Sequence, residues 1–174
     1  MKRHNGINMN RTIKLYSLEY NNAKTYMAAA LFVVGNIALP QLCHLVPQGG
    51  VTWLPIYFFT LVAAYKFGWL TGFLTAVASP LANSALFGMP AAAVLPAILL
   101  KSIALAAVAG FVAVRCRKVS LPLLALVVLF YQGLGTLGEW ALTGDLMNAM
   151  QDFRIGIPGM LLQIFGGYAV IRFI

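Results

Sequence analysis

Six apolar segments, separated by short groups of Gly, Pro and charged residues, occupy almost all of the chain after residue 24. A membrane-spanning helix needs about 20 predominantly apolar residues, and segments of this kind are long enough for one crossing each. The pattern predicts an all-α integral membrane protein, a compact bundle of six transmembrane helices in which the second is short. The predicted spans cover about residues 25–46, 51–65, 67–88, 91–114, 119–143 and 153–174.

The composition excludes an ordinary soluble protein. Of the 174 residues, 61% are hydrophobic and 9% are charged, whereas a soluble domain has about 45–50% apolar and about 25% charged residues. Residues 1–24 form a basic N-terminal segment, and the apolar run after it continues for a full membrane crossing. A secretory signal has a shorter apolar core that ends at a cleavage site. We therefore expect an uncleaved first helix, a membrane domain over residues 25–174, and no separate soluble catalytic domain.

The basic residues lie unevenly along the predicted topology. If the spans alternate in direction, ten Lys and Arg side chains fall on one side, and only Arg154 falls on the other. Cytoplasmic loops of membrane proteins carry the excess of Lys and Arg. The sequence thus predicts cytoplasmic N- and C-termini, and it accounts for the net charge of +8 without a nucleic-acid partner. The ten are Lys2, Arg3, Arg11, Lys14, Lys24, Lys66, Arg115, Arg117, Lys118 and Arg172.

No motif for catalysis, nucleotide binding or paired metal-binding cysteines occurs in the chain. With only four acidic residues, a paired-carboxylate or metal-dependent enzyme has little support, so we expect neither an enzyme nor a cofactor. Cys43 and Cys116 fall on opposite sides of the predicted membrane, which excludes a disulfide between them.

Polar side chains within the spans concentrate in the outer half of the predicted membrane. Lys101 is the exception, because it lies near the middle of the fourth span, with Gln132 and Gln163 at similar depth. A Lys at this depth costs about 2.5–3.5 kcal/mol on insertion scales, so it should face a cavity or a partner. Two interpretations stay open: contact with a ligand, or a structural pair with Glu139, which lies about 10 Å further outward at 1.5 Å per residue.

Other outer polar and aromatic residues have similarly open roles. His44 and Asn83 are candidates for ligand contact or for structural hydrogen bonding. Trp53, Tyr57 and Trp140 fit an interfacial aromatic belt or a stacking surface for a ligand. Small residues in the third and fifth spans, among them Gly72, Gly133, Gly135 and Gly138, predict close helix contacts.

Several short stretches resemble the substrate-binding S components of energy-coupling factor (ECF) vitamin transporters. These S components are membrane proteins with six short spans, both termini inside, and polar residues gathered in the outer half. The resemblance covers about residues 25–174 and rests on loose, mostly apolar motifs. They are Leu39-Pro40, Trp53-Leu54-Pro55-Ile56, the turn at residues 66–72, Ser79-Pro80-Leu81, and Leu86-Phe87-Gly88-Met89-Pro90.

The resemblance implies binding of a vitamin or its precursor from outside, in a pocket closed by the outer loops. It also implies partners, namely a transmembrane T subunit and two ATPase subunits. These partners would hydrolyse the ATP, because this chain has no nucleotide-binding motif. A non-transporting membrane scaffold or assembly protein, and a small secondary transporter or channel, are the alternatives; a channel should show polar residues along the full depth. The candidate binding residues are Lys101, Glu139, Gln132, Trp53, Asn83, Trp140, Gln48 and His44.

Overall fold

The computed structural model describes residues 15–16 and 19–174, and this part of the chain is helical, with no strands. It confirms the prediction of an all-α protein with membrane-type helices. Four residues of the predicted basic tail, Lys2, Arg3, Arg11 and Lys14, lie outside the described residues.

Five helical stretches are long and apolar enough to cross a membrane. Four are continuous helices: α1 (Ala23–Cys43), α4 (Trp69–Phe87), α5 (Leu95–Cys116) and α6 (Leu121–Thr143). The fifth, Gly49–Phe67, consists of α2 (Gly49–Trp53), the 3₁₀ turn η1 (Pro55–Tyr57) and α3 (Phe58–Phe67).

The C-terminal part of the chain is shorter and less regular. A stretch of 17 residues, Ile157–Phe173, forms a shorter apolar helix. It comprises α9 (Ile157–Leu161), the π-helical stretch η2 (Leu162–Gly166) and α10 (Gly167–Phe173). The short helices α7 (Leu146–Ala149) and α8 (Gln151–Arg154) connect it to α6.

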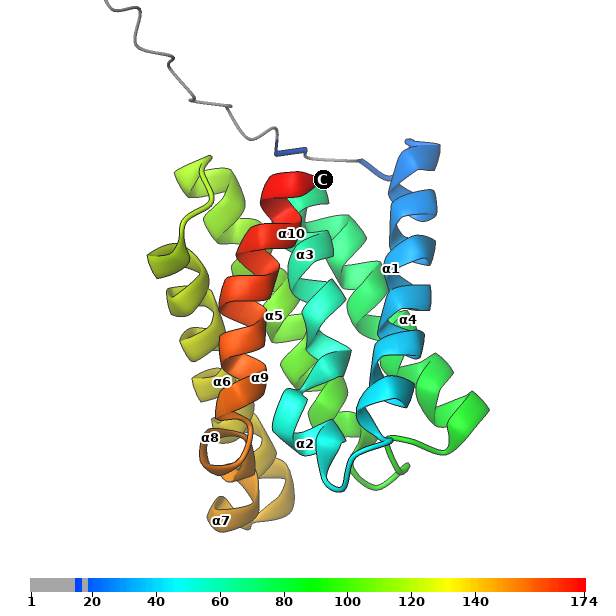
Figure 1. The fold of residues 1–174 in the computed structure, drawn as a ribbon, viewed down its shortest axis with the longest axis vertical. Coiled ribbons are helices and arrows are strands. Elements are labelled where there is room, and N and C mark those ends of the chain that lie inside the picture. Colours follow the sequence, from blue (N-terminus) through cyan, green and yellow to red (C-terminus); the bar gives the residue numbers. More distant parts are fainter. Residues whose placement is uncertain (1–14, 17–18) are drawn as a thin grey trace, which may run out of the picture.

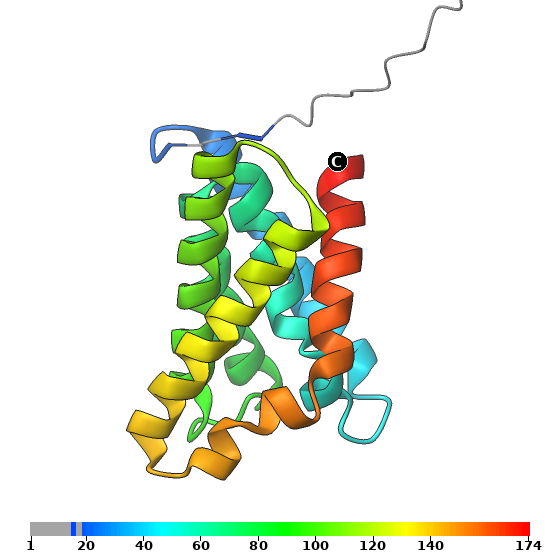
Figure 2. The same cartoon turned by 90° about the vertical axis from the view of Figure 1, so that its left-hand side faces the viewer.

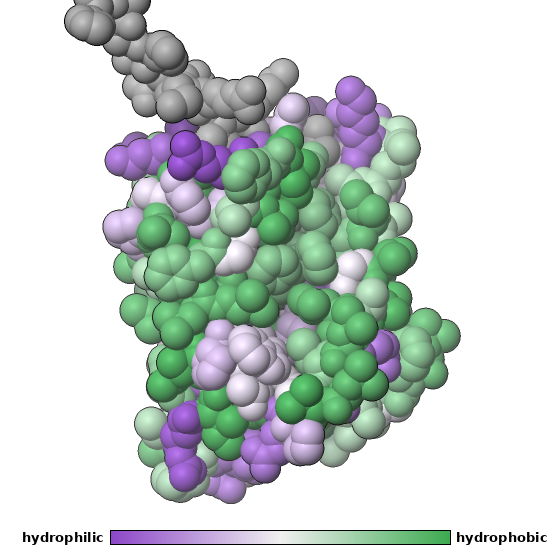
Figure 3. All heavy atoms as spheres, viewed as in Figure 1, coloured by the Kyte–Doolittle hydropathy of each residue, from purple (hydrophilic) through white to green (hydrophobic). Residues whose placement is uncertain are grey.

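The helices run roughly alongside one another, and α6 is inclined to the others (Figures 1 and 2). The start of α1 and the end of α10 lie at the same end of the bundle, at the top of Figure 1, while α2, α7 and α8 lie at the opposite end. In the view of Figure 3, hydrophobic side chains cover most of the middle of the molecule, and the most hydrophilic groups gather at the two ends. This distribution is that of a bundle that spans a membrane.

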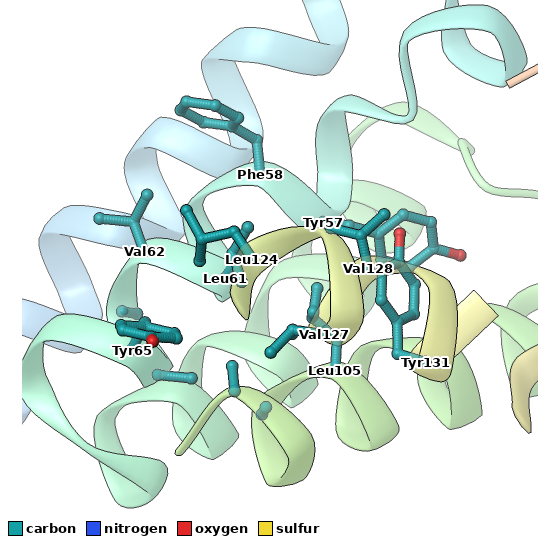
Figure 4. Packing of buried hydrophobic residues seen from close by; sticks show 14 of the residues in the cluster. Tyr57, Phe58, Leu61, Val62, Tyr65, Leu105, Leu124, Val127, Val128 and Tyr131 are labelled. Atoms are coloured by element: carbon teal, nitrogen blue, oxygen red, sulfur yellow. The ribbon is translucent and has the colours of Figure 1, made fainter. Parts of the chain in front are cut away.

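Helix α3 forms the centre of the bundle. All but two of its ten residues are buried, and it packs against α1, α4, α5 and α10. These helices cover α3 on nearly all sides, whereas α1, which is also apolar on all sides, exposes most of its surface. Figure 4 shows its side chains Leu61, Val62 and Tyr65 among residues of α5 and α6.

Two prolines lie inside helices, Pro40 in α1 and Pro80 in α4. Proline has no N–H, so the carbonyl of Asn36, four residues before Pro40, has no helical partner. The side-chain amide of Asn83 in α4 donates to that carbonyl at 2.9 Å. Asn36 in turn donates to the hydroxyls of Thr60 and Ser79, at 3.0 and 3.2 Å. A buried polar network therefore joins α1, α3 and α4 where α1 is interrupted.

Lys66 differs from its predicted environment. We expected the turn after the second span to place it at the aqueous interface, but the residue is 3% exposed. Its ammonium donates to the Ile171 carbonyl at 3.2 Å, in the last turn of α10. A cation is stabilised at a helix C-terminus, because the last carbonyls lack helical partners. Lys66 thus attaches the end of α10 to the end of α3.

The predicted role of the glycines holds for three of the four named above. An added Cβ would meet Ala64 at Gly72, Lys101 at Gly135 and Leu100 at Gly138. Gly133 is the exception, because nothing lies within 4 Å of the position a Cβ would take. Residues 133 and 135 lie on different faces of α6, and only the second faces α5.

We predict that Gly72→Ala destabilises the protein by about 1–3 kcal/mol, because the new methyl would overlap the Ala64 backbone. Gly133→Ala is the matched control, and it should be neutral or stabilise by up to about 1 kcal/mol through helix propensity. Thermal unfolding of both variants in the same detergent checks this. Equal destabilisation by the two substitutions would contradict the packing described here.

Candidate functional site

A cavity of about 390 Å³ lies at the end of the bundle that carries α2 and α8. Ligand pockets typically measure about 300–1,000 Å³ and combine apolar walls with a few polar groups. Its walls come from the ends of α1, α4, α5 and α6, from α2 and η1, from the segment after α4, and from α8. The lining residues are Pro40, His44, Gln48, Gly50, Val51, Leu54, Pro55, Ile56, Tyr57, Asn83, Met89, Pro90, Val94, Ala97, Ile98, Lys101, Glu139, Gln151 and Asp152.

Three charged side chains meet on the wall of this cavity. The Lys101 ammonium lies 2.8 Å from Asp152 Oδ2 and 2.5 Å from Glu139 Oε2. We call Lys101, Glu139 and Asp152 the charged triad. Its members come from α5, α6 and α8, so it joins the two longest helices to the irregular segment between α6 and α9. The Lys101 side chain is 5% exposed, and those of Glu139 and Asp152 are 17% and 13% exposed.

The triad shows that Lys101 pairs structurally, and the same residue lines the cavity, so the two interpretations from sequence are compatible. The residue count along the helices separated Lys101 from Glu139 by about 10 Å in depth, which made a direct pair seem remote. Part of that gap came from the predicted start of the helix: α5 begins at Leu95 and not at residue 91, so Lys101 is its seventh residue and lies nearer the cavity end than predicted. In addition, α6 is inclined to α5 (Figure 2), and Gly135 lets the Lys101 side chain lie against α6.

Asp152 is a site residue that sequence reasoning missed. Residue 152 falls between the fifth and sixth predicted spans, where an exposed connection is expected, whereas Asp152 is 9% exposed and faces Lys101. One signal was available: with only four acidic residues in the chain, a buried Lys has few possible counterions. The fold brings Asp152 to Lys101 because α7 and α8 turn back across the end of the bundle (Figure 2).

Asn83, another residue of the cavity wall, has a side-chain oxygen without a hydrogen-bond partner among the described residues. Its amide nitrogen donates to the carbonyls of Asn36 and Ser79, both at 2.9 Å, which fixes the orientation of the side chain. The residue is 1% exposed, and its Oδ1 atom has no hydrogen-bond partner in the described structure. A buried acceptor without a partner costs about 1–3 kcal/mol. Asn83 lines the cavity, and this oxygen is enclosed in the wall of the cavity.

The turn between α2 and η1 shapes another wall. Leu54 has a φ of 47°, the left-handed region that non-glycine residues seldom occupy. An added Cβ at Gly159 would meet the Trp53 and Leu54 backbone, so this glycine allows α9 to approach the turn closely. The turn directs Tyr57, which is 3% exposed, into the bundle against Tyr131, at 5.6 Å between ring centroids (Figure 4). The aromatic-belt interpretation of Tyr57 is therefore wrong.

The structure gathers five of the eight predicted binding residues around the cavity: Lys101, Glu139, Asn83, Gln48 and His44. Tyr57 and Gln151 also line it, and neither was among the predicted binding residues.

The other three predicted residues are not among the lining residues. Trp53 and Trp140 are 40% and 45% exposed, as an interfacial belt requires. Gln132 is fully buried, and neither polar atom of its side chain has a partner in the described part of the chain.

Comparisons with known proteins leave the site to be interpreted from its own chemistry. No protein family model matches the chain, and neither curated proteins nor solved structures give a significant match. Among the described residues, no group of three or more His, Cys, Asp or Glu side chains lies together as a potential metal site.

Removal of the cation from the triad tests its structural role. We predict that Lys101→Met destabilises the protein by about 3 kcal/mol, because two largely buried carboxylates lose their counterion. Arg154→Met is the control, since it removes an exposed basic side chain two residues from Asp152. Denaturant unfolding in micelles gives both free energies, and a Lys101→Met effect no larger than that of the control would contradict the pairing.

Proposed function

We propose that this protein is the membrane-embedded substrate-binding subunit of an ATP-driven importer for a small micronutrient, a vitamin or its precursor. The observation that carries the proposal is the cavity at one end of the bundle, with a buried charged triad and an unpartnered amide oxygen on its walls. Polar groups are costly to bury without partners. Helix packing alone gives no reason to place them around a cavity of this size, whereas ligand binding does.

The asymmetry of the bundle supports binding rather than conduction. The cavity lies at the end away from α10, and the helices beyond it pack a core of apolar and aromatic side chains around α3 (Figure 4). A channel requires polar groups along its whole length. The proposed substrate enters from the cavity end and cannot cross the closed bundle without a change in the position of the protein or its helices.

The proposed topology has six spans, with the shorter Ile157–Phe173 helix as the sixth. Both termini lie in the cytoplasm of a bacterial cell, and the cavity opens outward. Lys24, Lys66, Arg115, Arg117, Lys118 and Arg172 then lie toward the inner face, as the positive-inside rule favours. The chain itself catalyses no reaction in this proposal. An ECF-type T subunit and two ATPase subunits supply the energy for release of the substrate inward.

A ligand screen tests the binding role. We predict that one or more members of a panel of vitamins and their precursors raise the unfolding temperature of the purified full chain. A ligand at 100 times its dissociation constant stabilises the folded state by about 2.7 kcal/mol. A panel-wide absence of any shift would contradict the proposal and would favour a membrane scaffold or assembly protein.

Partner capture separates an importer subunit from a lone carrier. The tagged chain, expressed in its own host and purified in mild detergent, should retain a T subunit and ATPase subunits in stoichiometric amounts. Ligand binding without any such partner would instead favour a small secondary transporter.

A further inference from the structure

The charged triad carries a net charge of −1, because one ammonium faces two carboxylates. The ion pairs of Lys101 are to Oε2 of Glu139 and Oδ2 of Asp152. Among the described residues, no other side chain is hydrogen-bonded to either carboxylate. Apart from Lys101, His44 is the only residue among those lining the cavity whose side chain can carry positive charge.

An uncompensated negative charge in this position is unfavourable. Charges in the low-dielectric interior of a membrane protein interact strongly and require partners. The two carboxylate side chains retain 17% and 13% of their exposure, and both line the cavity. The excess charge is therefore available to whatever occupies the cavity.

Asn83 contributes no hydrogen-bond donor to the cavity. Both hydrogens of its amide nitrogen are donated to backbone carbonyls, and its oxygen is enclosed in the protein without a partner among the described residues. The excess carboxylate charge therefore carries the assignment, and it calls for a ligand with a hydrogen-bond donor and positive charge.

We propose that the ligand of this cavity is a small organic cation with N–H groups, such as a protonated amine or an amino-substituted cationic heterocycle. Its N–H groups donate to the carboxylate oxygens of Glu139 and Asp152. Lys101 then holds the two carboxylates in place, and an anionic substrate is disfavoured, because like charges placed together are costly. This inference rests on the proposed binding function and narrows its substrate class.

A charge-graded panel tests the inference on the wild-type protein. Pyridoxamine, pyridoxine and 4-pyridoxate share one ring and differ in a substituent that is cationic, neutral or anionic. Thiamine adds a second cation with an amino group, riboflavin a neutral ring system, and biotin, pantothenate and nicotinate further anions. Binding is measured by thermal shift and then by calorimetry with the full chain in detergent or nanodiscs.

The expected result is that the tightest ligand of the panel is an N–H cation and that anions bind at least about tenfold more weakly, the factor expected from one hydrogen bond to a charged group. A neutral or anionic compound as the tightest ligand would overturn the inference and leave the proposed binding function intact. No binding by any compound would overturn the binding function, and the inference with it.

Two matched variants then identify the source of the selectivity. Glu139→Gln keeps the side-chain size and leaves Lys101 paired with Asp152, so it removes only the excess negative charge. We expect about a tenfold or greater loss of affinity for the cation. Asp145→Asn is the control. It removes a carboxylate from an exposed residue between α6 and α7 that does not line the cavity, and it should leave the affinity unchanged. Equal affinities of the two variants would overturn the assignment, and if Glu139→Gln fails to fold, the wild-type panel still decides.

Discussion

The ammonium of Lys101, held between Glu139 and Asp152, is the interaction on which the cavity end of this bundle depends. A lysine buried in a membrane helix is expensive, and two other parts of the chain bring carboxylates to Lys101. One of them, Asp152, lies in the irregular segment between α6 and α9 and is buried. The ion pairs thus join α5 both to α6 and to the segment that leads to α9.

A second constraint acts on the other side of the cavity. Pro40 interrupts the hydrogen bonding of α1, and Asn83 donates to the carbonyl that is left free. That contact and a second one to the Ser79 carbonyl use both hydrogens of the Asn83 amide. Pro40 and Asn83 both line the cavity, so the interruption of α1 and its repair by Asn83 shape this wall.

The helices were largely predictable from sequence, because their apolar lengths and the Gly and Pro residues between them are local features. Lys101 was predictable as a site residue for a similar reason, since its cost in a membrane follows from its position alone. Its partner Asp152 was not, because the path of α7 and α8 across the bundle depends on tertiary packing. Tyr57 was misinterpreted for the same reason: the left-handed turn at Leu54 directs it inward, and no periodic pattern indicates such a turn. The role predicted for Gly133 was wrong because the presence of a glycine in a span does not show which face of the helix it lies on.

A double-mutant cycle between Lys101 and Asp152 tests the central claim most directly. The free energy of unfolding is measured in micelles for the wild type, Lys101→Met, Asp152→Asn and the double variant. The structure predicts a coupling free energy of about 1–3 kcal/mol between the two side chains, as for residues in one ion-pair network. Additive effects of the two substitutions, within about 0.3 kcal/mol, would contradict the claim that this pair holds the segment between α6 and α9 against α5.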